Sequence, residues 1–124
     1  LAHAVDVPTA ANAASVFRLS GDYNPLHVDP EVAKRAGFER PILHGLCTLG
    51  HTTRAVLDAI AGGDQRRFRS VRMRFASPVI AGQTLIVEVW LASPTEAIFR
   101  AKVKETSTVC ISNGAMQLHP AASL

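Results

Sequence analysis

A carboxylic acid and an imidazole, Asp22 and His27, lie five residues apart in a polar stretch of the chain. Pro25 lies between them and prevents a regular helix or strand from running through both positions. A stiff loop that holds these two groups together could both remove and deliver a proton. Each residue also has an ordinary explanation, because Asp22 can form an Asx turn and a lone histidine is more often packed or exposed than catalytic.

Composition indicates one domain spanning residues 1–124, long enough to bury a core without staples. Hydrophobic residues make up 48% of the chain, so we expect some apolar surface to be buried against a partner. No apolar run approaches the roughly 18 residues of a membrane-spanning helix, and no signal peptide is evident. Because the chain begins at Leu1, we expect a fragment, a processed product or one half of a longer protein.

The formal net charge is +3, with much of the excess between Arg66 and Arg74. This excess is typical either of a solvated strand or of attraction to an anionic ligand such as a nucleotide-bearing thioester. Nucleic acid is a poorer candidate, because few aromatic residues are present to stack bases. Cys47 and Cys110 lie in apolar runs and are expected to be reduced core residues, and the histidines show no metal-binding spacing.

Periodicity and capping signals predict helices at 10–19 and 30–36 and a long helix at 44–61. Thr9 and Asp29 are the expected caps of the first two helices, and Gly62 and Gly63 are expected to end the third. The long helix is predicted to be buried all round in its first half. Its expected apolar face comprises Leu46, Leu49, Thr53, Val56 or Leu57, and Ile60.

After the long helix the period changes to two, which predicts strands at 70–76, 84–92, 96–105 and 108–118. In the fourth strand the apolar phase slips at Asn113 and Gly114, where a bulge is favoured over a tight hairpin. The spacing suggests a meander of four antiparallel strands following one buried helix. The predicted class is α+β, a sheet wrapped round a helix.

Three motifs carry a resemblance to a known family: SGDYNPLHVDP at 20–30, GF at 37–38 and PILHGLCT at 41–48. Together they resemble the signature of type 2 (R-specific) enoyl-CoA hydratases, which are MaoC-like proteins. The similarity is greatest to the C-terminal half of the hydratase unit in peroxisomal multifunctional β-oxidation enzymes. It extends to Arg74-Phe75-Ala76, Gly82-Gln83-Thr84 and Ile111-Ser112-Asn113.

The resemblance implies a hot-dog fold, with Asp22 and His27 as the catalytic pair and Asn24 ordering their loop. It makes the Gly45 N–H an oxyanion donor for the thioester carbonyl, at a helix start where free N–H groups favour negative charge. His44 precedes that helix, and we expect it to cap the helix or support the site. Thr53 is placed where a small hydroxyl could line the pocket.

The expected activity is reversible hydration of a trans-2-enoyl-CoA to the (3R)-3-hydroxyacyl-CoA, with no metal or other cofactor beyond the CoA of the substrate. Alternatives are a hot-dog thioesterase and a non-catalytic half that binds acyl-CoA or stabilises a partner. We expect a second hot-dog unit as partner, either a second copy or an absent N-terminal half, and neither nucleic acid nor membrane. The resemblance implies a peroxisome in a eukaryote and the cytoplasm in a bacterium, and Ala122-Ser123-Leu124 only weakly echoes a peroxisomal tripeptide.

Overall fold

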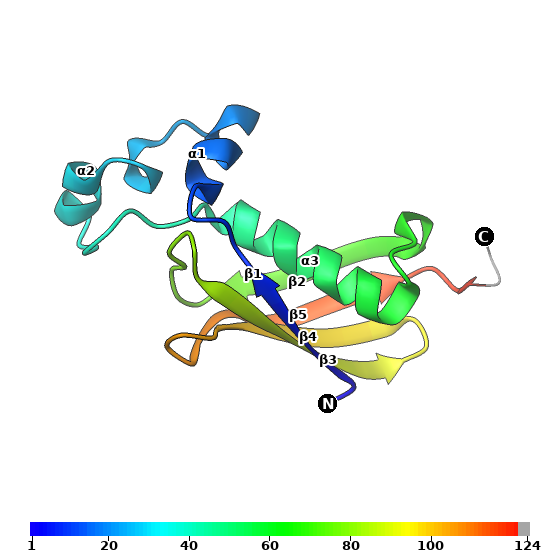
Figure 1. Ribbon diagram of the computed structural model, residues 1–124. Helices are drawn as coiled ribbons and strands as arrows, with labels where there is room; N and C mark the ends of the chain where they lie inside the picture. Colours follow the sequence, from blue (N-terminus) through cyan, green and yellow to red (C-terminus); the bar gives the residue numbers. More distant parts are fainter. Residues whose placement is uncertain (122–124) are drawn as a thin grey trace.

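The computed structural model describes residues 1–121, which form an antiparallel sheet with a long helix on one face (Figure 1). The C-terminal tripeptide noted above lies outside these residues. Within them the strands are β1 (His3–Pro8), β2 (Phe68–Phe75), β3 (Thr84–Ser93), β4 (Glu96–Val103) and β5 (Thr108–Leu118). The helices are α1 (Ala13–Phe17), α2 (Pro30–Arg35) and α3 (Gly45–Ala61), with 3₁₀ turns η1 (Arg18–Ser20), η2 (Pro25–His27) and η3 (Gln65–Arg67). The predicted α+β class is confirmed.

The strands lie in the order β1-β3-β4-β5-β2, and each neighbouring pair is antiparallel. β3, β4 and β5 form a meander, but the prediction that β2 would begin it is wrong, because β2 pairs with β5 at an edge of the sheet. The segment 76–83 carries the chain past the start of α3, where the Leu43 N–H donates to the Val79 carbonyl at 2.7 Å. This detour separates β3 from β2.

The opposite edge of the sheet is β1, which the sequence analysis did not predict. It pairs with β3 from His3↔Val89 to Pro8↔Thr84. Only Val5 and Val7 turn toward the core, so its alternating pattern is short and weak. The prediction that Thr9 caps a helix is wrong. Its hydroxyl donates to the Gln83 carbonyl at 2.6 Å and accepts from the Gly82 N–H at 2.9 Å.

Helix α3 packs on the sheet through a face that only partly matches the predicted one: Val56, Leu57 and Ile60 face the core as predicted, but the first half of the helix does not follow the prediction. Its buried residues are small or branched rather than the first two leucines: Thr48, Thr52, Ala55, Val56 and Leu57. Leu46 is 65% exposed, so the prediction of a first half buried all round is wrong within this chain. Leu46 and Leu49 are left on the outer side of the helix.

A bulge in β5 confirms the phase slip predicted there. Phe99 pairs with Gly114 while Ala101 pairs with Ile111, so β5 has one extra residue between these pairs. Asn113 takes the extra position with φ at +54°, a left-handed conformation that asparagine tolerates. A Cβ at Gly114 would lie 2.6 Å from the Phe99 ring, so the close strand approach requires glycine.

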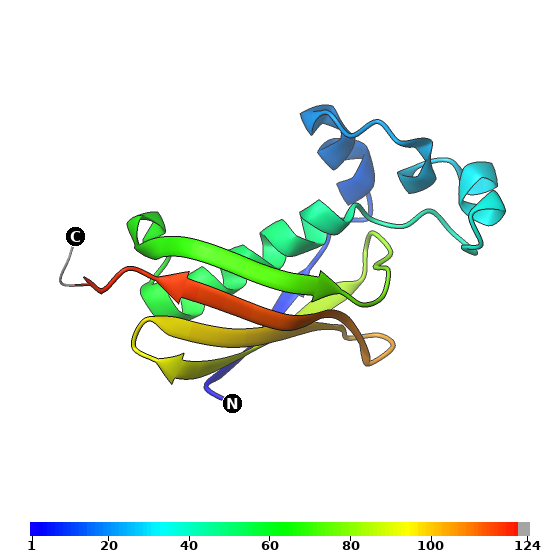
Figure 2. The same ribbon diagram turned by 180° about the vertical axis from the view of Figure 1, so that it is seen from behind.

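The segment between β1 and α3 projects beyond the N-terminal end of α3 and away from the sheet (Figure 2). α1 is shorter than predicted and passes into η1, where Gly21 turns the chain at φ +121°. Asp29 caps α2 as predicted, accepting from the Glu31 N–H at 2.9 Å, with Pro30 in the first turn. This projecting segment carries the loop of Asp22 and His27.

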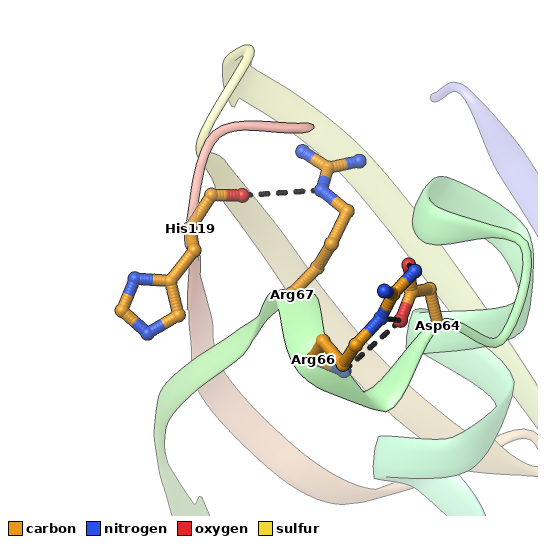
Figure 3. Close-up of polar contacts among 4 residues, drawn as sticks. All are labelled: Asp64, Arg66, Arg67 and His119. Atoms are coloured by element: carbon orange, nitrogen blue, oxygen red, sulfur yellow. Dashed lines mark hydrogen bonds and ion pairs between the residues drawn. The ribbon is translucent and has the colours of Figure 1, made fainter. Parts of the chain in front are cut away.

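Beyond the other end of α3, Arg67 is hydrogen-bonded to His119, the residue that follows β5 (Figure 3). Gly62 adopts the predicted left-handed cap conformation, and Asp64 caps η3 by accepting from the Arg66 N–H at 3.1 Å. The Arg67 Nε–H donates to the His119 carbonyl at 3.1 Å, and the His119 N–H donates back to the Arg67 carbonyl at 2.7 Å. Among the residues described, no helix is long and apolar enough to cross a membrane.

Candidate active site

The loop between η1 and α2 is shaped by hydrogen bonds from its own side chains. Asp22 Oδ1 accepts from the Asn24 N–H at 3.2 Å, and Asn24 Oδ1 accepts from the Leu26 N–H at 3.0 Å. Pro25 then opens η2, which presents His27. Asp22 is exposed and His27 is half-buried, so the pair lies at the edge between solvent and protein.

The orientation of His27 is fixed by a carbonyl that lies outside its own loop. His27 Nδ1 lies 2.8 Å from the Ile42 carbonyl oxygen. A carbonyl can only accept, so Nδ1 carries the hydrogen of this bond. In the neutral ring the lone pair is therefore on Nε2, the nitrogen that can take a proton from a substrate or a water molecule.

His44 lies at the centre of the site and is only 1% exposed. Its Nε2–H donates to the backbone carbonyl of Asp22 at 3.1 Å. Its ring stacks on His27 with centroids 3.8 Å apart and an angle of 27° between the planes. Phe17 of α1 contacts the ring as well, with centroids 4.7 Å apart. His44 occupies the N-cap position of α3, but its side chain makes no capping hydrogen bond.

Asp22, His27 and His44 form one cluster, in which the nearest nitrogen and carboxylate atoms lie within 4.8 Å of one another. One water molecule bonded to two atoms at about 2.8 Å each would span about 4.6 Å at a near-tetrahedral angle. The atoms are therefore close enough together for one water molecule to bridge two of them. A metal ion could also use such atoms, but one nitrogen on each histidine already donates to a carbonyl.

Gly45 begins α3 beside this cluster. The His44 carbonyl accepts from the N–H groups of Cys47 and Thr48 at 3.0 and 3.2 Å. Among the described residues, the N–H groups of Gly45 and Leu46 have no acceptor. These are the unsatisfied donors of a helix N-terminus, at the positive end of the helix dipole.

A cavity of about 300 Å³, here called the Gly45 pocket, joins this helix start to His27. Most of its lining is apolar, and it includes His27, Leu43, Gly45, Thr48, Phe75 and Cys110. Burial raises the pKa of the Cys110 thiol, which keeps it protonated and unsuited to nucleophilic attack. The pocket combines one imidazole, one helix start and an apolar wall.

The structure brings together most but not all of the residues singled out from the sequence. Asp22, Asn24, His27, His44 and Gly45 gather around the loop and the start of α3. Thr53 does not join them, because it lies on the outer side of α3 in a groove lined by Leu46, Leu49, Gly50, Thr53 and Leu57, here called the outer α3 groove.

Sequence reasoning missed Thr48, the Ile42 carbonyl and Phe75. Thr48 is one of two hydroxyl residues that line the Gly45 pocket, with Ser77, and it follows Gly45 by one helical turn. That spacing is the feature of the sequence from which Thr48 could have been predicted to lie near Gly45. The Ile42 carbonyl and the Phe75 ring reach the site only through the fold.

Comparison with known proteins places this chain in a family. Residues 1–114 match the model of the MaoC like domain. The mouse protein named peroxisomal multifunctional enzyme type 2 is 50% identical over 116 residues, which cover 94% of this chain and 16% of that protein. The Arabidopsis thaliana protein named enoyl-CoA hydratase 2, peroxisomal, is 50% identical over 97 residues, covering 78% of this chain and 31% of that protein. The chain therefore spans less than a third of either relative.

A solved structure shows the same architecture. The (R)-hydratase from A. caviae involved in PHA biosynthesis superposes with a TM-score of 0.76 at 25% identity, covering 95% of this chain and 92% of that one. The fold is thus the hot-dog fold expected from the sequence motifs. Here its long helix is α3 and its sheet runs from β1 to β2.

Proposed function

The chain belongs to the MaoC-like domain family, and from that premise we propose that it hydrates trans-2-enoyl-CoA reversibly to (3R)-3-hydroxyacyl-CoA. The observation that carries the proposal is the position of His27, which lies in one cluster with Asp22 and also lines an apolar pocket that contains an unsatisfied helix start. The names of the relatives and the (R)-hydratase superposition support it. This reaction is a step of fatty-acid metabolism.

In this mechanism Asp22 and His27 hold one water molecule between them. His27 Nε2 takes a proton as the water oxygen bonds to C3 of the enoyl group, and the double-bond electron pair moves toward the thioester oxygen. The Asp22 carboxylate orients the water and stabilises the imidazolium that forms. His27 then returns the proton to C2 on the same face, so hydroxyl and hydrogen are added and the protein is unchanged.

The negative oxygen formed in this step needs a donor, and we assign the Gly45 N–H. It is unpaired among the described residues, lies at the positive end of α3 and lines the same pocket as His27. A single oxyanion donor is worth about 10²–10³ in kcat in well-studied enzymes. Asn24 is assigned the role of fixing the loop, through its bond to the Leu26 N–H.

The proposed chemistry needs no metal or redox group, because proton transfer and a backbone donor account for each step. We expect activity to be unchanged after treatment with a chelator. A loss of activity that is restored by a divalent cation would overturn this part of the proposal and would assign the Asp22, His27 and His44 cluster to the ion.

The decisive experiment measures loss of crotonyl-CoA absorbance, with a chiral assay of the product. Asp22→Asn and His27→Gln are each expected to lower kcat at least ~10²-fold while the circular dichroism spectrum is kept. Asp58→Asn and His51→Gln are matched controls on α3 outside the site, and they should retain kcat. Near-normal turnover in either site variant would remove the catalytic assignment.

The same preparation tests the alternatives from other classes. Release of free thiol from a saturated acyl-CoA would indicate a thioesterase. Binding of acyl-CoA without turnover of either substrate would indicate a non-catalytic unit. The proposed hydratase predicts neither result.

We further propose that the chain is one hot-dog domain that pairs with a second hot-dog unit. Leu46 is 65% exposed beside the outer α3 groove, and Phe75 is 53% exposed at the end of edge strand β2. A partner would cover this apolar surface.

Light scattering should give twice the monomer mass if the second unit is another copy of the chain, and Leu46→Glu should reduce the measured mass to that of the monomer. A monomeric parent chain would indicate that the second unit comes from elsewhere, such as an N-terminal half.

The compartment proposed for a eukaryotic source is the peroxisome, because both curated relatives have this compartment in their names. A fluorescent fusion of the intact protein should colocalise with a peroxisomal marker. Diffuse fluorescence in the cytosol would contradict the assignment.

A further inference from the structure

We propose that His44 is a positioning residue, whose buried ring fixes the separation between the Asp22 loop and His27. The inference rests on the proposed function for its effect on catalysis, but its structural part can be tested without turnover. His44 contacts both reacting residues: it donates a hydrogen bond to the backbone carbonyl of Asp22 at 3.1 Å, and its ring stacks on that of His27 with centroids 3.8 Å apart.

The side chain of His44 is not explained by packing alone. It is 1% exposed, and its Nδ1 atom is buried without a hydrogen-bond partner among the described residues. A buried unpaired nitrogen is unfavourable, and an apolar side chain at this position would avoid that cost. The N–H bond from Nε2 to Asp22 is the contact that an apolar residue could not replace.

Helix capping does not explain the residue either. His44 is at the N-cap position, where a side chain usually accepts from the first turn, but it makes no such bond. Its ring turns instead toward η1 and the loop, between Phe17 and His27. The donors at the helix start are consequently left open.

The loop itself has few other attachments to the body of the protein. Residues 21–25 are exposed, and the bonds from Asp22 and Asn24 side chains are made within the loop. Two longer bonds join it to the segment before α3: His27 Nδ1–H to the Ile42 carbonyl, and His44 Nε2–H to the Asp22 carbonyl. One short segment, 42–45, thus positions the acid, the base and the oxyanion donor relative to one another.

Substitutions can separate the ring from its hydrogen bond. His44→Phe keeps an aromatic ring between Phe17 and His27 but removes the donor. We expect kcat for crotonyl-CoA to fall on the order of 10- to 100-fold, with KM changed less than about threefold, because misplacement of a reacting group acts on the chemical step. His44→Gln and His44→Met form a second, nearly isosteric pair in which only Gln retains an N–H, so Gln should retain several-fold more kcat than Met.

Hydrogen exchange supplies the readout that does not depend on activity. His44→Phe and His44→Met should speed exchange of the Asn24 and Leu26 amides, whereas His44→Gln and the control His51→Gln should not. If the parent chain hydrates no enoyl-CoA, the proposed function fails. The exchange data still test whether His44 holds the Asp22 loop in place. The positioning role is overturned if the donor-free variants keep both kcat and loop protection, or if Gln is as impaired as Met. Should His44→Phe fail to fold, the Gln and Met pair decides.

Discussion

The two ends of helix α3 are completed in different ways. At the C-terminal end Gly62 turns the chain, and the Gly63 N–H donates to the Leu57 carbonyl at 3.2 Å. Asp64 then caps η3, and a reciprocal pair of hydrogen bonds joins Arg67 and His119. Figure 3 shows the bond of this pair that the Arg67 side chain donates. At the N-terminal end the Gly45 and Leu46 N–H groups have no acceptor among the described residues.

The difference shows where the molecule gains stability and where it keeps binding capacity. Saturated backbone groups at the C-terminal end lower the free energy of the folded state. Open donors at the N-terminal end forgo that gain and remain available to an oxygen of a ligand. Buried His44 marks the same contrast, because its side chain donates to the loop and accepts from no N–H of the helix.

The same substitution at the two ends should therefore have opposite effects, and the larger is expected at Gly45. In Gly45→Ala the new Cβ would lie 3.0 Å from the Phe75 ring, forcing that ring to shift at the pocket. We expect kcat to fall at least about 10-fold, since approach to the Gly45 N–H is restricted. Unfolding in denaturant should change little, because alanine favours helix by about 1 kcal/mol and offsets the new contact.

A second substitution sharpens this test. Adding Phe75→Ala to Gly45→Ala removes the crowded ring and should restore part of kcat. Unchanged kcat in Gly45→Ala would show that substrate does not approach this backbone position.

Gly62→Ala should show the reverse pattern. Gly62 has φ at +60°, and a Cβ there would meet no atom within 4 Å, so the cost is backbone strain alone. We expect the free energy of unfolding to fall by about 1–2 kcal/mol with kcat unchanged. Urea denaturation and the crotonyl-CoA assay on one sample measure both. A fall in kcat at constant stability would mean that the two ends are coupled.

Elements with a complete local signal were predictable from the sequence. The bounds of β5 and the bulge at Asn113 followed from alternation and its slip, and the Asp29 cap followed from side-chain chemistry. β1 was not predicted because two inward valines are too short a pattern. The face of α3 was predicted correctly at Val56, Leu57 and Ile60 but wrongly in the first half of the helix, because the residues buried there include Thr48 and Thr52 rather than Leu46.

The site divides in the same way between local and distant contacts. The loop bonds of Asp22 and Asn24 span two residues and follow from sequence. The bonds from His27 to Ile42 and from His44 to Asp22 span 15 and 22 residues, and no periodicity specifies them. Thr53 was misplaced because its position depends on which face of α3 meets the sheet.

The smallest expected effect on stability comes from the charge of Asp64, which follows the C-terminal end of α3. The hydrogen bond from Arg66 holds the pKa of the Asp64 carboxyl below its ordinary value. A lowered folded-state pKa stabilises the fold at pH values above the unfolded pKa, about 3.9 for aspartate, and this stabilisation disappears as pH falls through the folded-state value. Asp64→Asn keeps one oxygen to cap η3, but it removes the charge and the second oxygen, which accepts from Arg66 Nη2 at 3.0 Å.

The melting temperature of Asp64→Asn should therefore be lower than that of the parent by at most a few degrees at pH 7, because exposed ion pairs contribute little. The difference should shrink with added salt and vanish in acid, once Asp64 is protonated in both states. A difference that stays constant from neutral pH into strong acid would mean that η3 depends on the hydrogen bonds of the Asp64 side chain rather than on its charge. Backbone and capping hydrogen bonds alone would then stabilise the C-terminal end of α3.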